Sequence, residues 1–193
     1  MTFEVEQKFP VPDHSVLLAK LSALAATRGE PIEQIDTYYA HPTRDFAKTD
    51  EALRIRRAGG DNFLTYKGPK LDVETKTRRE IEIPLAPGES AAASFGVLLE
   101  ALGFSPVATV RKIRTLLTAA WQGQSVEVAL DDVDGLGTFV ELELTADEAE
   151  VDAARDAILS LASELGLGSA DHSAERRSYL ELLLERATAP EIP

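Results

Sequence analysis

Charged side chains recur at every second position in several segments of the chain. Glu4, Glu6 and Lys8 show this spacing near the N-terminus, and Arg54 and Arg56 repeat it further on. Side chains two apart on a β-strand point to the same side, so the spacing predicts strands with one ionic face. The predicted ionic faces carry eight acids and seven bases: Glu4, Glu6, Glu80, Glu82, Glu127, Asp131, Glu141 and Glu143, with Lys8, Arg54, Arg56, Lys67, Arg78, Lys112 and Arg114.

Acids and bases on one surface have complementary chemistry. Carboxylate oxygens bind hard divalent cations, whereas arginine and lysine bind the oxygens of an anion. If these faces enclosed a cavity, like charges would repel one another unless ligands of both signs were bound. A cavity of this kind favours a metal-chelated polyphosphate over free phosphate. The alternative is a sheet with one solvated face, whose charges serve only solubility.

Alternation of apolar and polar residues predicts eight strands. We expect them at 2–11, 30–41, 52–58, 62–68, 75–84, 107–121, 125–133 and 138–145. Gly59, Gly60 and Asp61 predict a hairpin between the third and fourth. Helical spacing predicts four helices, at 14–28, 89–102, 147–165 and 174–186. Residues 42–50 are expected to form a loop or a short helix, and residues 70–75 a charged loop.

The helices constrain where the ionic faces can point. Their apolar stripes need a partner, and the aliphatic sides of the strands supply one, so the ionic sides face open water or one another. Eight antiparallel strands are enough to close into a barrel, whose interior would then be a polar channel. With 193 residues, 44% of them hydrophobic, and no linker rich in Pro, Gly or Ser, we expect one α+β domain over residues 1–186 and a flexible tail at 187–193.

Composition excludes several classes of function. A net charge of -13 argues against broad binding to nucleic acid or anionic membranes. The chain has no cysteine, which excludes disulfides and thiolate chemistry, and its three histidines lie far apart in sequence. The first ten residues lack the apolar run of a secretory signal, and no stretch reaches membrane-spanning length. We expect a cytoplasmic monomer or homodimer without nucleic-acid or membrane partners.

The ionic segments resemble the motifs of the CYTH superfamily, the triphosphate tunnel metalloenzymes. Residues 4–8 have the ExExK pattern of that family. Further matching stretches follow in the family's order: DTYYAHPTRDFAKTDEALRIRR at 36–57, TYKGPK at 65–70, RREIEI at 78–83, RKIR at 111–114, LDDVDGLGTFVELEL at 130–144 and RRSYLELL at 176–183. The stretches DGLGTFVELEL and RSYLELL most resemble the class IV adenylyl cyclase branch, whose relatives include thiamine triphosphatases and inorganic triphosphatases. The resemblance implies a closed eight-stranded antiparallel β-barrel with a charged interior and helices packed outside.

The resemblance also implies roles for particular residues. The metal ligands, for Mg²⁺ or Mn²⁺, would be Glu4, Glu6, Asp131, Glu141 and Glu143, with Glu127, Glu80 and Glu82 as weaker candidates. The phosphate-binding residues would be Lys8, Arg54, Arg56, Lys67, Arg78, Lys112, Arg114 and Arg177. Three other arginines lie on the opposite face of their strands and are expected to be peripheral: Arg57, Arg79 and Arg111. Tyr38 and Lys67 match a catalytic pair of thiamine triphosphatases, although core packing explains Tyr38 equally well. A lysine among other cations should have a lowered pKa, so that Lys67 could help to take a proton from tyrosine or water.

Two reactions remain open from the sequence, together with a function that is not catalytic. A cyclase would convert ATP to cyclic AMP and pyrophosphate, and a triphosphatase would hydrolyse thiamine triphosphate, inorganic tripolyphosphate or a nucleoside triphosphate. Similarity to the branch favours the cyclase, but no residue can be assigned from the sequence to adenine recognition. The third alternative is a module that only binds polyphosphate or a nucleotide. No P-loop and no GxSxG elbow occurs in the sequence.

Overall fold

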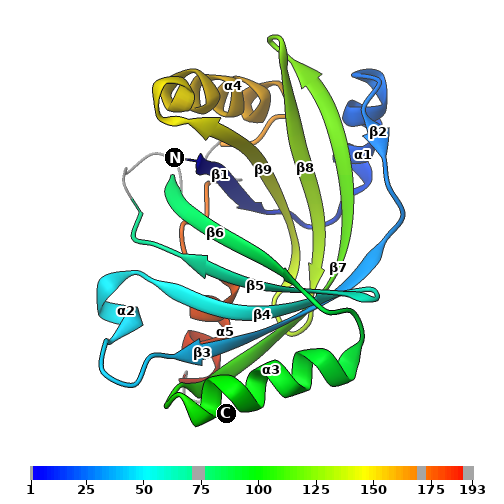
Figure 1. Cartoon of the computed structure of the whole chain (residues 1–193). Helices are drawn as coiled ribbons and strands as arrows, with labels where there is room; N and C mark the ends of the chain where they lie inside the picture. Colours follow the sequence, from blue (N-terminus) through cyan, green and yellow to red (C-terminus); the bar gives the residue numbers. More distant parts are fainter. Residues whose placement is uncertain (1, 71–76, 169–172, 189–193) are drawn as a thin grey trace.

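The strands close into an antiparallel ring (Figure 1). The computed structural model describes residues 2–70, 77–168 and 173–188, and within these ranges eight strands form the ring. They are β1 (Thr2–Pro10), β3 (Ile32–Ala40), β4 (Ala52–Ala58), β5 (Asp61–Lys67), β6 (Arg78–Leu85), β7 (Ser105–Trp121), β8 (Gln124–Val133) and β9 (Gly137–Asp147). Their order around the ring is β7-β3-β4-β5-β6-β1-β9-β8, and pairing of β8 with β7 closes it. The predicted closed eight-stranded barrel is therefore confirmed.

Sequence-distant strands meet on both sides of β1. It pairs along its whole length with β9, from Thr2 opposite Asp147 to Pro10 opposite Phe139. On its other side, β1 pairs with the start of β6, where Glu4 lies opposite Arg78. The N-terminal strand therefore completes the ring.

Five helices and one short strand accompany the ring in the described part of the chain. The helices are α1 (Ser15–Ala23), α2 (Phe46–Thr49), α3 (Glu89–Ala101), α4 (Val151–Glu164) and α5 (Tyr179–Thr188), and a 3₁₀ turn at Glu148–Glu150 precedes α4. Strand β2 (Thr27–Arg28) pairs with β7 outside the ring. None of the described helices is long and apolar enough to cross a membrane.

The boundaries of two predicted helices are wrong, and backbone pairing explains both. Helix α1 ends at Ala23 instead of reaching residue 28, because Ala25 has a positive φ of 54° and Thr27 and Arg28 pair with β7. Helix α5 begins five residues later than expected. The preceding segment follows β1, where the Glu175 N–H donates to the Lys8 carbonyl oxygen at 2.7 Å.

The other predicted boundaries differ less. The hairpin is confirmed: Ala58 lies opposite Asp61, and Gly59 adopts the positive φ that such a turn requires. The C-terminal tail begins later than expected, because α5 includes residues 187 and 188. The rest of the tail and residues 71–75 of the charged loop lie outside the described residues.

The main hydrophobic core lies outside the ring, between the strands and the helices. Outward side chains such as Val5, Val128 and Leu142 pack with Ile158 and Leu161 of α4. Helix α3 covers the outer side of β3 and β4 in the same way (Figure 1). These outer faces are the aliphatic sides of the strands, so the ionic sides point into the ring.

Leu161→Ala tests the outer core. Leu161 is fully buried, so its truncation should lower the free energy of unfolding by about 3 kcal/mol through lost burial and the remaining cavity. Urea denaturation measures this change. Val97→Ala on α3 is the control: Val97 is 66% exposed, and its substitution should change stability by no more than about 0.5 kcal/mol. Equal effects of the two substitutions would contradict this placement of the core.

Candidate active site

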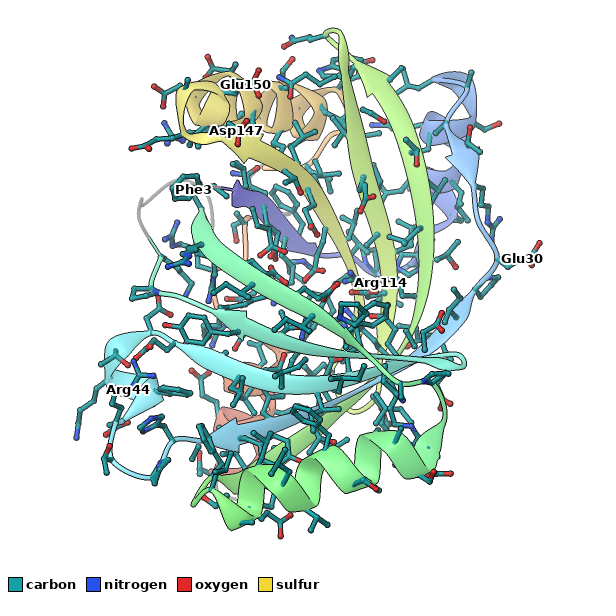
Figure 2. The ribbon with its side chains drawn as sticks, viewed as in Figure 1. Phe3, Glu30, Arg44, Arg114, Asp147 and Glu150 are labelled. Atoms are coloured by element: carbon teal, nitrogen blue, oxygen red, sulfur yellow. The ribbon has the colours of Figure 1, made fainter. Side chains whose placement is uncertain are left out.

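The inward ionic side chains line a cavity within the ring. It has a volume of about 270 Å³, and seven carboxylates and four basic groups line it. Glu6, Arg56 and Glu141 come from three different strands and line this one cavity. Figure 2 shows Arg114 inside the ring, whereas Glu30 lies at the periphery. The strand faces therefore converge on a common interior.

A smaller cavity of about 70 Å³ adjoins the first toward α5. Glu6, Arg54, Lys67 and Glu141 line both cavities, so the two form one charged tunnel. Lys8, Tyr38, Arg78 and Lys112 line the smaller cavity and not the larger one. Most of the predicted site residues therefore share this tunnel.

One wall of the tunnel is acidic. Glu143 on β9 lies directly opposite Glu6 on β1 and, on its other side, opposite Glu127 on β8. All three line the larger cavity. Like charges on directly opposed strand positions destabilise a sheet. Burial, together with the neighbouring charge of Glu4, raises the pKa of Glu143 well above its usual value. Glu127, a weaker candidate for metal binding on the sequence alone, thus lies in line with the stronger candidates Glu6 and Glu143.

The donor set of the acidic wall fits a hard divalent cation. Oxygen ligands are those that Mg²⁺ and Mn²⁺ prefer, and a bound cation would relieve the repulsion among Glu6, Glu143 and Glu127. Within the described residues, no three acidic or histidine side chains are gathered closely enough to form a preassembled metal site. Some carboxylates of the tunnel lining pair with bases: Glu4 and Glu80 with Lys67, and Glu141 with Arg114.

Asp36 holds the two arginines of the opposite wall. Its carboxylate accepts hydrogen bonds from Arg56 Nε at 2.7 Å and Arg56 Nη2 at 2.8 Å, and from Arg54 Nη1 at 3.1 Å. Burial alone would raise the pKa of Asp36, but the charges of Arg54 and Arg56 outweigh it and hold the pKa far below the usual value. Sequence reasoning missed Asp36. The spacing along the strand could have revealed it, because Asp36 lies two residues before the candidate Tyr38 and therefore on the same face of β3.

Lys67 is an ion-paired cation, contrary to the expectation of a lowered pKa. Its Nζ lies 2.5 Å from Glu4 Oε2 and 2.7 Å from Glu80 Oε2. Burial disfavours the charged ammonium, but Glu4 and Glu80 outweigh burial and raise the pKa of Lys67. The expectation failed because it counted the cations near Lys67 and not the carboxylates of β1 and β6. Tyr38 is buried and lines the tunnel, and its catalytic role stays a prediction.

Asp131 anchors two bases. It is completely buried, and it accepts from Lys112 Nζ at 2.9 Å and Arg114 Nε at 2.7 Å. Its side chain is absent from the described linings of both cavities, so the structure does not bring it to the tunnel surface with the other metal candidates. The charge of Asp131 raises the pKa of Lys112, but burial and the charge of Arg114 have the larger effect and lower that pKa to about 8.

Tyr179 of α5 closes one end of the tunnel. Its hydroxyl donates to Asp131 Oδ2 at 2.9 Å, and its ring centroid lies 4.0 Å from Lys8 Nζ and 5.0 Å from Lys112 Nζ. Such cation–π contacts hold the two ammonium groups against one ring. Tyr179 lies within the family-like stretch RRSYLELL at 176–183, but the sequence alone did not assign this residue to the site.

The Arg177 guanidinium does not reach the tunnel. Its side chain is 48% exposed and pairs with Glu175 and with Glu185 at 2.6 Å. Only its backbone takes part in the site, since the Arg177 carbonyl oxygen accepts from Lys8 Nζ at 2.5 Å. The segment before α5 is bound to β1 through the Glu175 N–H, and the Arg177 side chain is held outside the tunnel by Glu175 and Glu185.

Comparison with known proteins agrees with this architecture. A family model described as the CYTH domain matches residues 2–179, and the chain belongs to this family. The family and the names of the relatives below identify an enzyme that acts on triphosphates. The chain is 38% identical to the "Putative adenylate cyclase MJ0240" of Methanocaldococcus jannaschii over 93% of its own length and 97% of that protein. It is 30% identical to "Adenylate cyclase CyaB" of Aeromonas hydrophila, over 96% and 91%. The solved structure of the PH1819 protein from Pyrococcus horikoshii is 40% identical and superimposes with a TM-score of 0.78, covering 95% of this chain and 99% of that one.

Asp36→Asn tests the anchor of the basic wall. Removing one charge of a buried ion-pair network should lower the free energy of unfolding at pH 7 by about 3 kcal/mol. The folded-state pKa of Asp36 lies below its unfolded value, so this contribution is complete above a pH of about 4 and is lost as the pH falls toward the folded-state pKa. Urea titrations at several pH values measure the difference from the unsubstituted protein.

Glu89→Gln is the matched control. Glu89 also pairs with an arginine, at 2.9 Å from Arg57, but its side chain is 77% exposed. Its substitution should change stability by less than about 1 kcal/mol. A difference for Asp36→Asn that persisted unchanged at pH 2 would contradict the assignment to its charge.

Proposed function

We propose that the protein is a divalent-metal-dependent adenylyl cyclase that converts ATP, bound in the charged tunnel, to cyclic AMP and pyrophosphate. The observation that carries the proposal is the opposition of an acidic wall on β1, β8 and β9 to basic side chains on β4, β5 and β7 within one cavity. A metal-chelated triphosphate matches both walls. The two curated relatives support the cyclase reaction, because both bear that name and align over more than nine-tenths of this chain.

The basic residues of the tunnel would hold the triphosphate. Arg54 and Arg56 present guanidinium groups suited to bidentate contact with phosphate oxygens, and Lys67 acts as a point charge. The raised pKa of Lys67 keeps it protonated, so we assign it phosphate binding and not proton abstraction. Lys8, Lys112 and Arg114 extend the same positive surface toward α5.

The glutamates of the acidic wall would hold the metal. Glu6, Glu141 and Glu143 are the leading candidates, with Glu4 and Glu127 beside them. Bound Mg²⁺ or Mn²⁺ would supply charge neutralisation of the phosphates and would lower the pKa of a coordinated hydroxyl. Asp131 is better described as a positioning residue for Lys112 and Arg114.

The reaction forms one P–O bond and breaks another. The ribose 3′ oxygen attacks the α-phosphorus and loses its proton to solvent water. The bond from the α-phosphorus to the oxygen that bridges to the β-phosphorus breaks, and pyrophosphate leaves with that oxygen. The chain's part in this step is to fix the phosphates and to neutralise charge.

Hydrolysis of a triphosphate is the second candidate. The substrate would be thiamine triphosphate, inorganic tripolyphosphate or a nucleoside triphosphate, and water would replace the 3′ hydroxyl. The observation that favours it is the extra carboxylate of Glu143, which lies with Glu6 and Glu127 where an attacking water could be oriented. A module that only binds phosphate would have no use for this wall and ranks third.

A substrate panel distinguishes the reactions. The protein is incubated with ATP, thiamine triphosphate or tripolyphosphate and with Mg²⁺ or Mn²⁺, and cyclic AMP, pyrophosphate and orthophosphate are resolved. Equal amounts of cyclic AMP and pyrophosphate from ATP are expected. Orthophosphate without cyclic AMP would replace the cyclase by the triphosphatase, and no turnover of any substrate would contradict both.

Glu143→Gln should affect activity and stability in opposite directions. Loss of a metal-binding carboxylate should reduce turnover with Mg²⁺ or Mn²⁺ by about a hundredfold or more. Removal of one of three opposed charges should raise the free energy of unfolding in EDTA by up to about 1 kcal/mol. Product assays and urea denaturation measure the two quantities.

Glu30→Gln is the control for this prediction, because Glu30 is exposed at the periphery of the barrel (Figure 2). It removes the same charge and should alter neither quantity appreciably. If Glu143→Gln kept full turnover, the metal assignment of the acidic wall would be wrong.

A further inference from the structure

Gln34 is a buried amide on the inner face of β3. Its side chain lines the larger cavity, and only 9% of the residue is exposed. Among the described residues, its Oε1 has no hydrogen-bond partner. Leaving such a group unsatisfied costs about 1 to 3 kcal/mol, and native proteins seldom do so without a reason. A ligand in the cavity would satisfy it.

Apolar side chains accompany Gln34 at this end of the tunnel. Phe63 and Leu116 line the same cavity, and Leu116 is 39% exposed although it lies on the inner face of β7. Ala58, the residue directly opposite Gln34 on β4, also lines the cavity and occupies little space. The ionic lining therefore gives way here to an aromatic ring, two aliphatic residues and one amide.

This group lies next to the phosphate-binding arginines. Phe63 is directly opposite Arg56 on the neighbouring strand, and Leu116 is two residues beyond Arg114 on β7. A ligand whose phosphates contact Arg56 would extend its organic end toward Phe63 and Gln34. An inorganic polyphosphate could accept a hydrogen bond from the Gln34 amide, but it has no apolar surface to pack on Phe63 or Leu116.

We propose that Gln34 and Phe63 form the subsite for the adenine base of the nucleotide. This inference rests on the proposed function and names the residues that read its substrate. A glutamine amide offers one acceptor and one donor, which match the amino group and the adjacent ring nitrogen of adenine. Phe63 offers a face for stacking, and Leu116 adds apolar contact.

A further pocket, beside α5, is the alternative location for the adenine base. It has a volume of about 400 Å³, and charged residues line it together with aromatic and aliphatic ones such as Phe46 and Leu180. It shares Tyr38, Arg78 and Ser178 with the smaller cavity, so it continues the tunnel beyond that cavity. The tunnel narrows toward it, however, to the smaller cavity of about 70 Å³. At that end Tyr179 packs with Tyr38 and Phe139. The Gln34 end adjoins the wider cavity directly, so it is the better continuation of the phosphate site.

Equilibrium binding tests the subsite without requiring turnover. Calorimetry with Mg²⁺ compares two slowly reacting probes, α,β-methylene-ATP and the tripolyphosphate analogue imidotriphosphate. For Gln34→Leu and for Phe63→Leu we expect the Kd of the nucleotide to rise about tenfold relative to that of imidotriphosphate. Glu33→Gln, on the outer face of the same strand, is the control and should leave the ratio of the two Kd values unchanged. Gln34→Asn replaces Gln34→Leu if the latter does not fold.

The outcomes separate this inference from the proposed function. An equal loss of affinity for both probes, or no loss for the nucleotide, would overturn the subsite. A loss of nucleotide affinity in Leu180→Ala, without one in Gln34→Leu, would move the base to the pocket beside α5. If the unsubstituted protein binds both probes and makes no cyclic AMP, the cyclase proposal fails while the subsite stands. If it binds neither probe, both fail.

Discussion

Charge must be neutralised inside a closed ring of strands, and the rest of this structure depends on that constraint. Each strand presents aliphatic side chains outward to the helices, so closure leaves the ionic side chains facing one another. Buried charges are costly unless they are paired and hydrogen bonded. Asp36 with Arg54 and Arg56, and Asp131 with Lys112 and Arg114, meet this requirement through short contacts between neighbouring strands.

The same pairs prepare the tunnel for a charged ligand. Fully buried carboxylates such as Asp36 and Asp131 hold the bases in position. Some glutamates at the cavity surface also pair with bases, as Glu4 does with Lys67. On the proposed function, a metal and a polyphosphate would replace these contacts. Acids behind the bases would then set the geometry of the bases, and acids at the cavity surface would bind the cation.

Much of the fold followed from the period-two pattern, because parity along a strand is a local property. The period-two pattern distinguished the inward Arg54 and Arg56 from the outward Arg57. The turn at Gly59 and Gly60 predicted the hairpin. Pairing between strands is not local, and the errors arose there. Asp36 was missed and Lys67 was given a lowered pKa, because each outcome depends on which strand lies alongside. The burial of Asp131 against Lys112 and Arg114 could not be predicted for the same reason. Arg177 and the start of α5 were misplaced because the Glu175 N–H binds β1 before the helix begins.

The position of β1 in the ring also bears on how the chain is made. The residues that pair between β1 and β9 are 129 to 145 positions apart in the sequence, from Pro10 with Phe139 to Thr2 with Asp147, so β1 meets its principal neighbour only after β9 has been synthesised. Until then the edge that carries Glu4 and Glu6 remains open, and contacts of such long sequence separation form slowly. Assembly of the acidic wall therefore waits for the synthesis of β9, because a nascent fragment that ends before β9 lacks the central strand of that wall.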